Sequence, residues 1–232
     1  MPRPKKKTPA ARTERNPARP AETATKQRIL EIATQEFSRR GYDGARIDEI
    51  MRRSKVSKNL VYHYFKSKEK LFIAVLDAAY RRMQTRLDTL SLETEAPIPG
   101  MRKLIREVFR YWGEAPDFIG LLGSENFHKA RHLRQMDAIP DGYPKLIKNI
   151  RRLLDLGRKD GDFHSRVDPV DLYISIAALG YHYFSNIHTL STLFNRDFSA
   201  PRETAARLRH IEDVILGYLL NGKKNTKTAA RR

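Results

Sequence analysis

The stretch that decides the fold runs from Ser54 to Glu69 and reads SKVSKNLVYHYFKSKE. It predicts the end of one short helix, a tight turn, and a second short helix that opens on the polar run Ser57-Lys58-Asn59. A third helix then opens at Lys68. Short polar and cationic side chains at the first turn of a short helix are typical of a helix end that enters a DNA groove.

Positive charge is concentrated around this stretch and at the two ends of the chain. The formal net charge is +18. Residues 23–90 hold fifteen Lys and Arg against eight Asp and Glu, whereas residues 91–222 hold eighteen against seventeen. The remaining excess lies in residues 1–22 and 223–232. This distribution is expected if one end of the fold meets a polyanion such as DNA.

The composition excludes several kinds of site. The 232 residues contain no cysteine, which excludes disulfides, thiolate metal sites and thiol catalysis. No apolar run approaches the roughly 20 residues that span a bilayer, and no apolar segment of a signal peptide follows the basic N-terminus. We therefore expect a soluble, cytoplasmic protein without a membrane partner.

Both ends of the chain are predicted to be disordered basic tails, residues 1–22 and 222–232. The first contains five prolines and the run Lys5-Lys6-Lys7 but almost no large apolar side chain. Such a composition does not offset the entropy cost of ordering. Two interpretations stay open for the first tail: an arm that follows DNA phosphates and reaches a minor groove, or a solubilising segment without fixed contacts.

Residues 23–88 are predicted to form a compact, basic unit of helices. The first helix is expected to begin near Thr25, a good N-cap, and to end at Gly41. Its apolar stripe consists of Ile29, Ile32, Ala33 and Phe37. The expected partners of that stripe are Ile47, Ile50, Met51, Val56, Leu60, Val61 and Phe65. A fourth helix, from about Ser67 to about Leu87, is long enough to leave the unit.

Residues 89–221 are predicted to form a second domain that is also helical. We expect helices at about 101–113, 117–135, 143–159, 169–194 and 202–220. Asp168 followed by Pro169 is typical of an N-cap with proline at the first helical position. No strand pattern or repeat is present, so the predicted fold class is all-α, with a three-helix helix-turn-helix domain followed by a helical bundle.

A run of apolar, glycine and aromatic residues follows a specific order from residue 29 to residue 71. The run is Ile29-Leu-x-Ile-Ala-x-x-x-Phe37-x-x-x-Gly41-Tyr42-x-Gly44, Ile47-x-x-Ile50, Val56-Ser57-Lys58 and Tyr62-x-Tyr64-Phe65-x-Ser67-Lys68-Glu69-x-Leu71. It resembles the DNA-binding domain of the tetracycline-repressor (TetR) family of bacterial transcription regulators. The resemblance implies a homodimeric repressor that a small-molecule effector releases from its operator. Lys55 departs from the glycine common in the family's turn, which predicts local strain or an altered turn.

The predicted DNA contacts lie at the start of the second helix, along the third helix and at the start of the fourth helix. Ser57, Lys58 and Asn59 are the expected readers of base edges, and the amide of Asn59 could make a bidentate pair with adenine. The expected contacts with phosphates are Arg46, Tyr62, His63, Tyr64 and Lys68. Helix four then connects this unit to the second domain.

The resemblance also implies a dimer in which the last two helices form a four-helix interface with their symmetry mates. The candidate interface residues are Ala177, Ala178, Gly180, Leu208, Ile211, Ile215 and Tyr218. The alternative is that both helices only cover the core of one chain.

An effector pocket is expected among the helices between residues 101 and 194. The candidate lining residues are Tyr111, Trp112, Phe118, Phe127, His128, His182, Tyr183 and Phe184. As a group they favour a flat or partly aromatic ligand over a sugar phosphate, although each of them could be ordinary core.

Three potential metal ligands occur close together in the second domain. Glu125, His128 and His132 would share one face of a continuous helix, at a spacing that could bind a divalent metal. A hydrogen-bonded or solvated face is the commoner outcome, so we expect no metal and no cofactor.

Two other classes of function remain to be compared with a repressor. The alternative hypothesis is an architectural or non-specific DNA-binding protein driven by the basic tails. An enzyme is not expected, because no nucleophile motif, phosphate-binding glycine loop or paired-carboxylate arrangement occurs in the chain.

Overall fold

The computed structural model describes residues 20–136, 142–163 and 167–220. Within these ranges the chain forms ten α-helices and one short 3-10 helix, η1, and no strand. The elements are α1 (Pro20–Gly44), α2 (Ile47–Ser54), α3 (Lys58–Phe65), α4 (Lys68–Asp88), α5 (Pro97–Glu114), α6 (Pro116–Phe127), η1 (Leu133–Gln135), α7 (Gly142–Lys159), α8 (Pro169–Ser185), α9 (Ile187–Leu193) and α10 (Pro201–Leu220). The all-α prediction is confirmed.

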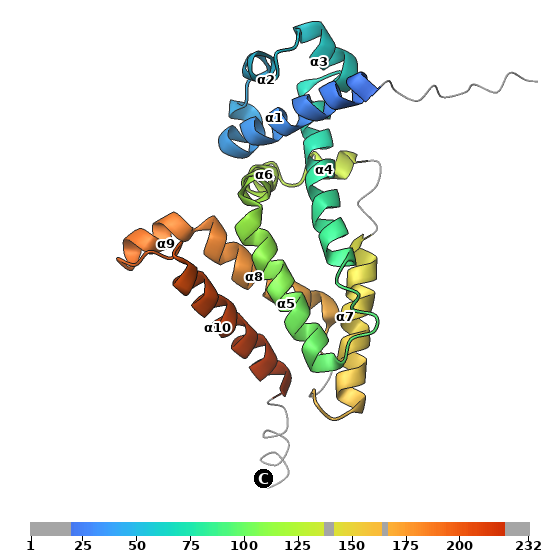
Figure 1. The fold of residues 1–232 in the computed structure, drawn as a ribbon, viewed down its shortest axis with the longest axis vertical. Helices are drawn as coiled ribbons and strands as arrows, with labels where there is room; N and C mark the ends of the chain where they lie inside the picture. Colours follow the sequence, from blue (N-terminus) through green and yellow to red (C-terminus); the bar gives the residue numbers. More distant parts are fainter. Residues whose placement is uncertain (1–19, 137–141, 164–166, 221–232) are drawn as a thin grey trace, which may run out of the picture.

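The molecule is elongated, with α1, α2 and α3 at one end (Figure 1). Helix α4 leads away from this end and packs against α5 and α7. Helix α5 packs against α7, α8 and α10, and is therefore the central helix of the second domain. Helix α6 lies at the level where the two parts meet and packs against α1. We call α1–α3 with the first turns of α4 the DNA-binding unit, and α5–α10 the second domain.

Helix α1 begins earlier than the sequence predicted. It starts at Pro20, and the first helical position accepts proline because the N–H there has no partner. Glu22 lies in the first turn, where a negative charge is favourable. Thr25 is therefore inside the helix and is not its N-cap. Gly41 interrupts the helix with φ of 67° and ψ of 179°, in agreement with the predicted end.

The predicted apolar stripe of α1 is buried. Ile29, Ala33 and Phe37 are fully buried, and Ile32 packs against the same core. Helix α4 extends this core toward the second domain. Its buried residues are Leu71, Phe72, Val75, Leu76, Ala79 and Met83. One hydrophobic core thus runs from the DNA-binding unit into the second domain along α4.

Two predicted helices of the second domain are interrupted. The segment predicted as one helix over 117–135 stops at Phe127, because Lys129 and Ala130 have φ of 54° and 58°. The segment predicted over 169–194 divides at Asn186, whose side-chain amide donates to the carbonyl oxygen of His182 at 3.0 Å. A side chain that bonds to the backbone in this way competes with the helix.

The crossing of α1 and α6 is very close. A Cβ atom placed on Gly120 would lie 2.3 Å from the carbonyl oxygen of Ser38, so only glycine fits at this point. Because α6 belongs to the second domain and α1 to the DNA-binding unit, the contact joins the two parts directly.

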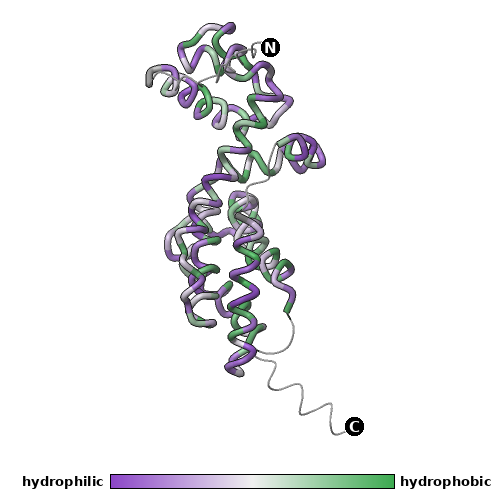
Figure 2. The backbone as a smooth tube through the Cα atoms, turned by 90° about the vertical axis from the view of Figure 1, so that its right-hand side faces the viewer, coloured by the Kyte–Doolittle hydropathy of each residue, from purple (hydrophilic) through white to green (hydrophobic). Residues whose placement is uncertain are grey.

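Hydrophilic and hydrophobic residues are interspersed along the helices (Figure 2). Among the described residues, no helix combines the length and the apolar character that a membrane span requires.

Candidate nucleic-acid interface

The turn between α2 and α3 has the geometry of a left-handed helix end. Lys55 has φ of 54° and ψ of 44°, and its N–H donates to the carbonyl oxygen of Met51. A non-glycine residue in this region costs about 1–2 kcal/mol. The strain predicted from the lysine at this position is therefore present. Ser57 follows as the N-cap of α3, and its hydroxyl oxygen accepts the N–H of Leu60 at 3.3 Å.

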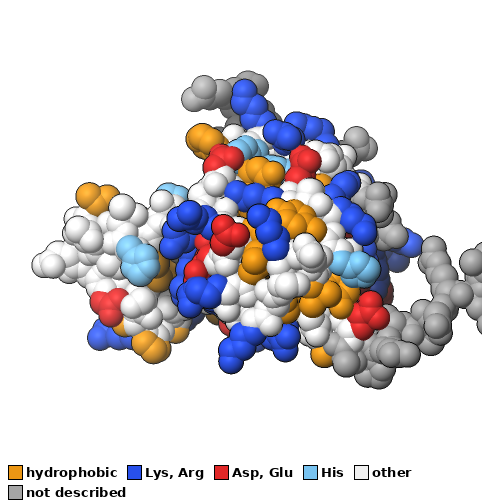
Figure 3. Space-filling model, turned by 90° about the horizontal axis from the view of Figure 1, so that it is seen from above, with side chains coloured by type: hydrophobic (Ala, Val, Ile, Leu, Met, Phe, Trp, Pro, Cys, Tyr) orange, Lys and Arg blue, Asp and Glu red, His pale blue; other side chains and the backbone are white. Residues whose placement is uncertain are grey.

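The short helix α3 has one buried face and one exposed face. Val61 and Phe65 are buried in the core, as predicted. Lys58, Asn59 and His63 are exposed. The end of the molecule that carries this helix shows many Lys and Arg side chains (Figure 3). The polar first turn of α3 is therefore accessible. The buried face of α3 fixes the direction of the helix.

Leu60 corrects one detail of the prediction. It is only half-buried and does not belong to the hydrophobic core, although its neighbour Val61 does. Successive residues on a helix are about 100° apart, so Leu60 lies between the core face and the surface. Its apolar side chain is next to Asn59 on the exposed edge of α3.

Buried polar groups hold α2 and the turn in place. Ser54 is fully buried, and its hydroxyl donates to the carbonyl oxygen of Ile50 at 2.6 Å. The Nε–H of Arg28 in α1 donates to the carbonyl oxygen of Ser54 at 3.1 Å. Glu36 is also buried and accepts the N–H of Arg46 at 3.3 Å, at the start of α2. The Arg46 side chain remains exposed.

The predicted phosphate contacts have different surroundings. Tyr62 and Tyr64 are half-buried, and Tyr64 packs against the core and against His63, with ring centroids 5.4 Å apart. The ammonium of Lys68 points toward α1 and donates to the carbonyl oxygen of Asp43 at 3.2 Å. Burial lowers the pKa of Lys68. The ammonium of Lys68 thus already has a partner in the protein. A contact of Lys68 with a DNA phosphate stays a prediction.

Two further lysines belong to this surface and were not predicted as DNA contacts. Lys55 and Lys66 are exposed, and each occupies the C-cap of a short helix with positive φ. Within the described ranges, neither these lysines nor Lys58 forms an ion pair. The signal that could have found them is the density of lysine around α3.

The three potential metal ligands do not form a cluster. The helix that was expected to carry them ends at Phe127, so they do not share a helical face. Glu125 and His132 are bonded to each other, whereas His128 Nε2 lies 3.2 Å from Asp43 Oδ2. The part of the chain that the structure describes contains no group of three or more His, Cys, Asp or Glu side chains that could hold a metal.

The predicted effector residues lie in several different places. Tyr111, Trp112 and Phe118 are buried together, and the rings of Trp112 and Phe118 stack with centroids 5.7 Å apart. Tyr183 and Phe184 pack against Phe109, one helical turn before Trp112 on α5.

The other three predicted residues are further separated. Phe127 is 81% exposed, His182 is exposed, and His128 contacts the DNA-binding unit. The eight residues thus do not line one cavity. Their aromatic side chains alone could not show this, because such side chains occur both in cores and in pockets.

Part of the predicted dimer surface is buried inside one chain. Ile211 and Ile215 belong to the core of the monomer. A Cβ atom on Gly180 would lie 2.8 Å from Cδ1 of Trp112, so this glycine allows α8 to approach α5 of the same chain. These contacts belong to the fold of one chain, although Ile215 also lines a groove between α8 and α10. The assignment of the three residues to an interface between chains stays a prediction. Ala177 and Leu208 are half-buried.

A different apolar face is exposed on α8 and α10. Its large residues are Val170, Ile174, Val214 and Tyr218, between 43% and 56% exposed. A groove of about 710 Å³ runs between the two helices, and Ala178, Val214 and Tyr218 are among the residues that line it. The predicted residues Ala178 and Tyr218 lie on this face, whereas Val170, Ile174 and Val214 were missed.

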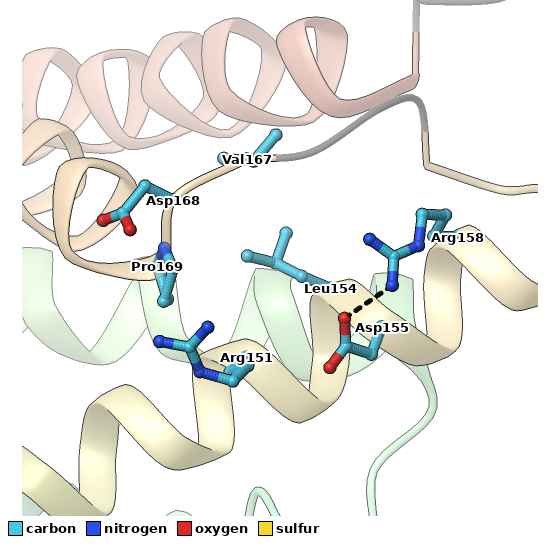
Figure 4. Close-up of a pocket in the computed structure, with 7 residues that line it drawn as sticks. All are labelled: Arg151, Leu154, Asp155, Arg158, Val167, Asp168 and Pro169. Atoms are coloured by element: carbon cyan, nitrogen blue, oxygen red, sulfur yellow. Dashed lines mark hydrogen bonds and ion pairs between the residues drawn. The ribbon is translucent and has the colours of Figure 1, made fainter.

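A smaller cavity of about 320 Å³ lies between α7 and the start of α8 (Figure 4). Most of its polar groups already have partners. Arg158 donates to Asp155 at 3.0 Å, and Asp168 accepts two backbone N–H groups as the N-cap of α8. The cavity contains none of the predicted site residues.

Comparison with known proteins agrees with this geometry. The profile described as "Bacterial regulatory proteins, tetR family" matches residues 29–75, and the profile "Tetracyclin repressor-like, C-terminal domain" matches residues 97–215. Among solved structures, a bacterial regulatory protein of the tetR family from Rhodococcus has the same fold. Its TM-score is 0.64 at 18% identity, over 84% of this chain and 96% of that one.

Relatives with similar sequences are transcription regulators by name. The HTH-type transcriptional repressor NicS of Pseudomonas putida is 32% identical over 192 residues, which are 83% of this chain and 91% of the relative. The HTH-type transcriptional regulator RutR of Escherichia coli strain K12 is 31% identical over 163 residues, 70% of this chain and 75% of the relative. This chain therefore belongs to the tetR family of bacterial regulatory proteins, which bind DNA through a helix-turn-helix and regulate transcription.

Proposed function

We propose that this protein is a homodimeric repressor that binds an operator through α3 and leaves it when a small-molecule effector binds. The observation that carries the proposal is the exposed polar turn of α3, held from behind by a buried core. Its similarity to NicS, which is named a repressor, favours repression.

Within α3, Asn59 and Lys58 are the proposed readers of base edges. An Asn amide matches adenine in the major groove, and a Lys ammonium reaches guanine or a phosphate. The half-exposed Leu60 is available for a thymine methyl group. Lys55 and Lys66 flank the helix and are proposed to contact the phosphates on either side.

The proposed dimer forms through the exposed apolar face of α8 and α10. Apolar residues between 43% and 56% exposed, next to an apolar groove, would gain from burial against a second copy. Two copies are also needed because a two-part operator presents its half-sites about 34 Å apart, one turn of DNA. Val214→Asp should shift the protein toward monomers in analytical ultracentrifugation. Asp213→Ala, next to it and exposed, is the control.

The proposed effector site is the aromatic interior around Trp112. The indole N–H of Trp112 is buried, and the described residues provide no hydrogen-bond partner for it. Tyr80 packs against Phe118 and Tyr143, which adds hydroxyl groups to this interior. These surroundings suit a flat, largely apolar molecule that carries a hydrogen-bond acceptor.

Fluorescence offers a direct test, because Trp112 is the only tryptophan of the chain. Titration with small aromatic compounds, beginning with indole and benzamide, should change its emission at saturable concentrations and weaken DNA binding in parallel. An effector that weakens DNA binding without any change in Trp112 emission would move the proposed site elsewhere.

DNA binding is tested by selecting duplexes from random sequence with the full chain. A repressor selects a two-part site with half-sites one DNA turn apart. A chain reduced to residues 20–220 should keep this preference at lower affinity. If the preference disappears with the tails, the protein is a non-specific DNA-binding protein and the proposal is wrong.

A further inference from the structure

The turn that follows α6 is strained and closed by a buried carboxylate. Lys129 and Ala130 are consecutive residues with positive φ, and neither is glycine. Glu125, only 3% exposed, accepts the backbone N–H groups of His132 and Leu133, each at 2.8 Å. Glu125 Oε2 also lies 2.7 Å from His132 Nδ1, which must carry the proton because a carboxylate only accepts. The side chain of Glu125 thus joins the end of α6 to the residues that follow the turn, in addition to the backbone hydrogen bonds within the turn.

His132 in turn packs against the DNA-binding unit. Its ring is fully buried, and its centroid lies 4.4 Å from that of Tyr42 in α1 and 4.9 Å from that of Phe72 in α4. Its Nε2 has no hydrogen-bond partner among the described residues. The ring of His132 therefore fills an aromatic pocket of the DNA-binding unit, and among the described residues its one hydrogen-bonding partner is Glu125.

Polar contacts surround this packing. Glu69, in the first turn of α4, accepts hydrogen bonds from Arg131 at 3.1 Å and from Gln135 at 3.0 Å. The hydroxyl oxygen of Ser124 accepts the N–H of Tyr42 at 2.8 Å. Residues 124–135, which we call the clasp, therefore contact α1 and α4 at several points next to α3.

The clasp also faces the aromatic interior of the second domain. Burial raises the pKa of Tyr80 to about 12, and the charges of Tyr143 and Glu125 contribute to the same direction. Tyr80 contacts Phe118, with ring centroids 5.2 Å apart. Glu125 thus lies at the end of the helix that carries Phe118, while its bonded partner His132 touches the DNA-binding unit.

A cap that only ends α6 would not need these features. The backbone already closes α6 as a Schellman turn, because the N–H of Ala130 donates to the carbonyl oxygen of Glu125 and the N–H of Lys129 donates to that of Asn126, each at 3.0 Å. The side chain of Glu125 is not needed to satisfy these two carbonyl groups. A phenylalanine could fill the aromatic pocket without a buried polar nitrogen. The hydrogen bond between Glu125 and His132 therefore has an orienting role that an apolar contact would not provide. A hydrogen bond fixes the direction of the two groups that it joins.

We propose that Glu125 and His132 are positioning residues that fix the orientation of the DNA-binding unit relative to the second domain. Operator affinity then depends on a hydrogen bond that no DNA contact touches. This inference goes beyond the proposed effector and dimer, and requires neither of them.

The orientation can be measured directly, because the chain has no cysteine of its own. Exposed Gln27 in α1 and exposed Lys148 in α7 are replaced by cysteine and labelled with a donor and an acceptor dye. Labelled chains are diluted with unlabelled full-length chains, so that only distances within one chain contribute. The wild type should give one narrow distance distribution.

Three variants are compared in this background. Glu125→Gln replaces the carboxylate with a neutral amide, and His132→Phe removes the ring nitrogen, so that neither variant keeps the carboxylate–imidazole bond. His132→Phe keeps the aromatic packing. Glu212→Gln is the matched control, because Glu212 is equally buried but bonds only within the second domain, to Arg102 and Arg106. Circular dichroism and thermal unfolding establish that each variant is folded.

We expect Glu125→Gln and His132→Phe to broaden the distance distribution and to weaken binding to a duplex selected by the wild type about tenfold, a usual size for coupling between sites. The double variant should be no worse than either single variant, because both remove the same bond. Glu212→Gln should lower the unfolding temperature without changing either measurement.

Two results would overturn the proposal. One is an unchanged distance distribution in folded Glu125→Gln and His132→Phe, whatever happens to stability, because the pair would then only cap α6. The other is a broadened distribution with equal or tighter operator binding, since the clasp would then not favour the DNA-binding orientation. Neither result depends on the effector or on dimer formation.

Discussion

The lysines around α3 and the arginines of α5 differ in their partners. In the second domain, Arg102 and Arg106 of α5 share Glu212, and Arg110 lies 4.0 Å from Glu107. Around α3, Lys55, Lys58 and Lys66 are exposed, and the described residues offer them no ion pair. The difference teaches that net charge alone does not identify a DNA surface. The informative feature is a set of cations that the protein itself leaves unneutralised.

The largest effect should come from the boundary between the DNA-binding unit and the second domain. Gly120→Ala places a Cβ atom 2.3 Å from the backbone oxygen of Ser38, so α6 must move away from α1. We expect the free energy of unfolding to fall by about 2–3 kcal/mol, as for other overpacked sites. Chemical denaturation measures it. Gly123→Ala is the matched control, because a Cβ atom there meets nothing within 4 Å. It should be neutral or stabilising by up to about 1 kcal/mol, and equal losses in both variants would contradict the close crossing.

Asn59→Ala sharpens the comparison on the side of the DNA-binding unit. Asn59 is exposed, so its removal should hardly change stability. It should cost about 1–3 kcal/mol of operator affinity, confined to one base pair of each half-site. The affinity for duplexes in which each base pair of the operator is varied in turn shows whether the loss is confined to one base pair. The same loss on operator and random DNA would show that Asn59 does not read a base.

Glu212→Gln tests the internal pairing of the second domain. Burial alone would raise the pKa of Glu212, but the hydrogen bonds and charges of Arg106 and Arg102 outweigh it and hold the pKa below the usual value. A lowered pKa means that the ionised carboxylate stabilises the fold above the unfolded pKa and that this contribution is lost as the pH falls through the folded pKa.

The substitution should therefore cost about 1–2 kcal/mol of unfolding free energy at neutral pH, and progressively less below about pH 4. Urea denaturation at several pH values measures the difference between wild type and variant. A difference that stays constant down to pH 3 would mean that the charge of Glu212 is not what holds α10 to α5.

Lys55→Gly should have the smallest effect on stability, and in the favourable direction. Glycine adopts the φ of 54° without a Cβ clash, so we expect a gain of about 0.5–1 kcal/mol. The lost cation should weaken operator and random DNA alike and reduce the salt slope by about one. Lys55→Ala removes the same charge but keeps the strain, so it should weaken DNA without stabilising the protein. Matching stabilities of the two variants would argue against strain at this turn.

The sequence predicted the DNA-binding unit far better than the second domain. For α3, the spacing of the apolar residues and the polar residues of the turn before it both indicate a short helix with one buried face. Val61 and Phe65 are buried on that face. The clasp could not be predicted, because Lys129 and Ala130 adopt positive φ without the glycine or asparagine that usually signals it. The turn is accompanied by the bonds between Glu125 and His132 and by the packing of His132 on Tyr42 and Phe72, which no sequence pattern indicates.

The residues predicted for an interface on α10 come from both the covered and the exposed side of this helix. Apolar residues occur on two sides of this helix, so Ile211 and Ile215 fit an interface pattern as well as Val214 and Tyr218 do. Only the packing of α10 on α5 decides which side is covered. The aromatic residues pose the same problem, because Trp112 and Phe118 have the composition of a ligand site and the packing of a core.

Helix α4 has a geometric consequence for the regulation of DNA binding. Its 21 residues span about 30 Å at 1.5 Å per residue. A tilt of about 5° at the end near α7 would move the other end by about 3 Å. That displacement is close to the 3.4 Å rise between successive base pairs. A change too small to disturb the packing of the second domain could therefore shift α3 by nearly one base step. In the proposed dimer, such a shift is enough to misplace the two copies of α3 relative to one turn of DNA.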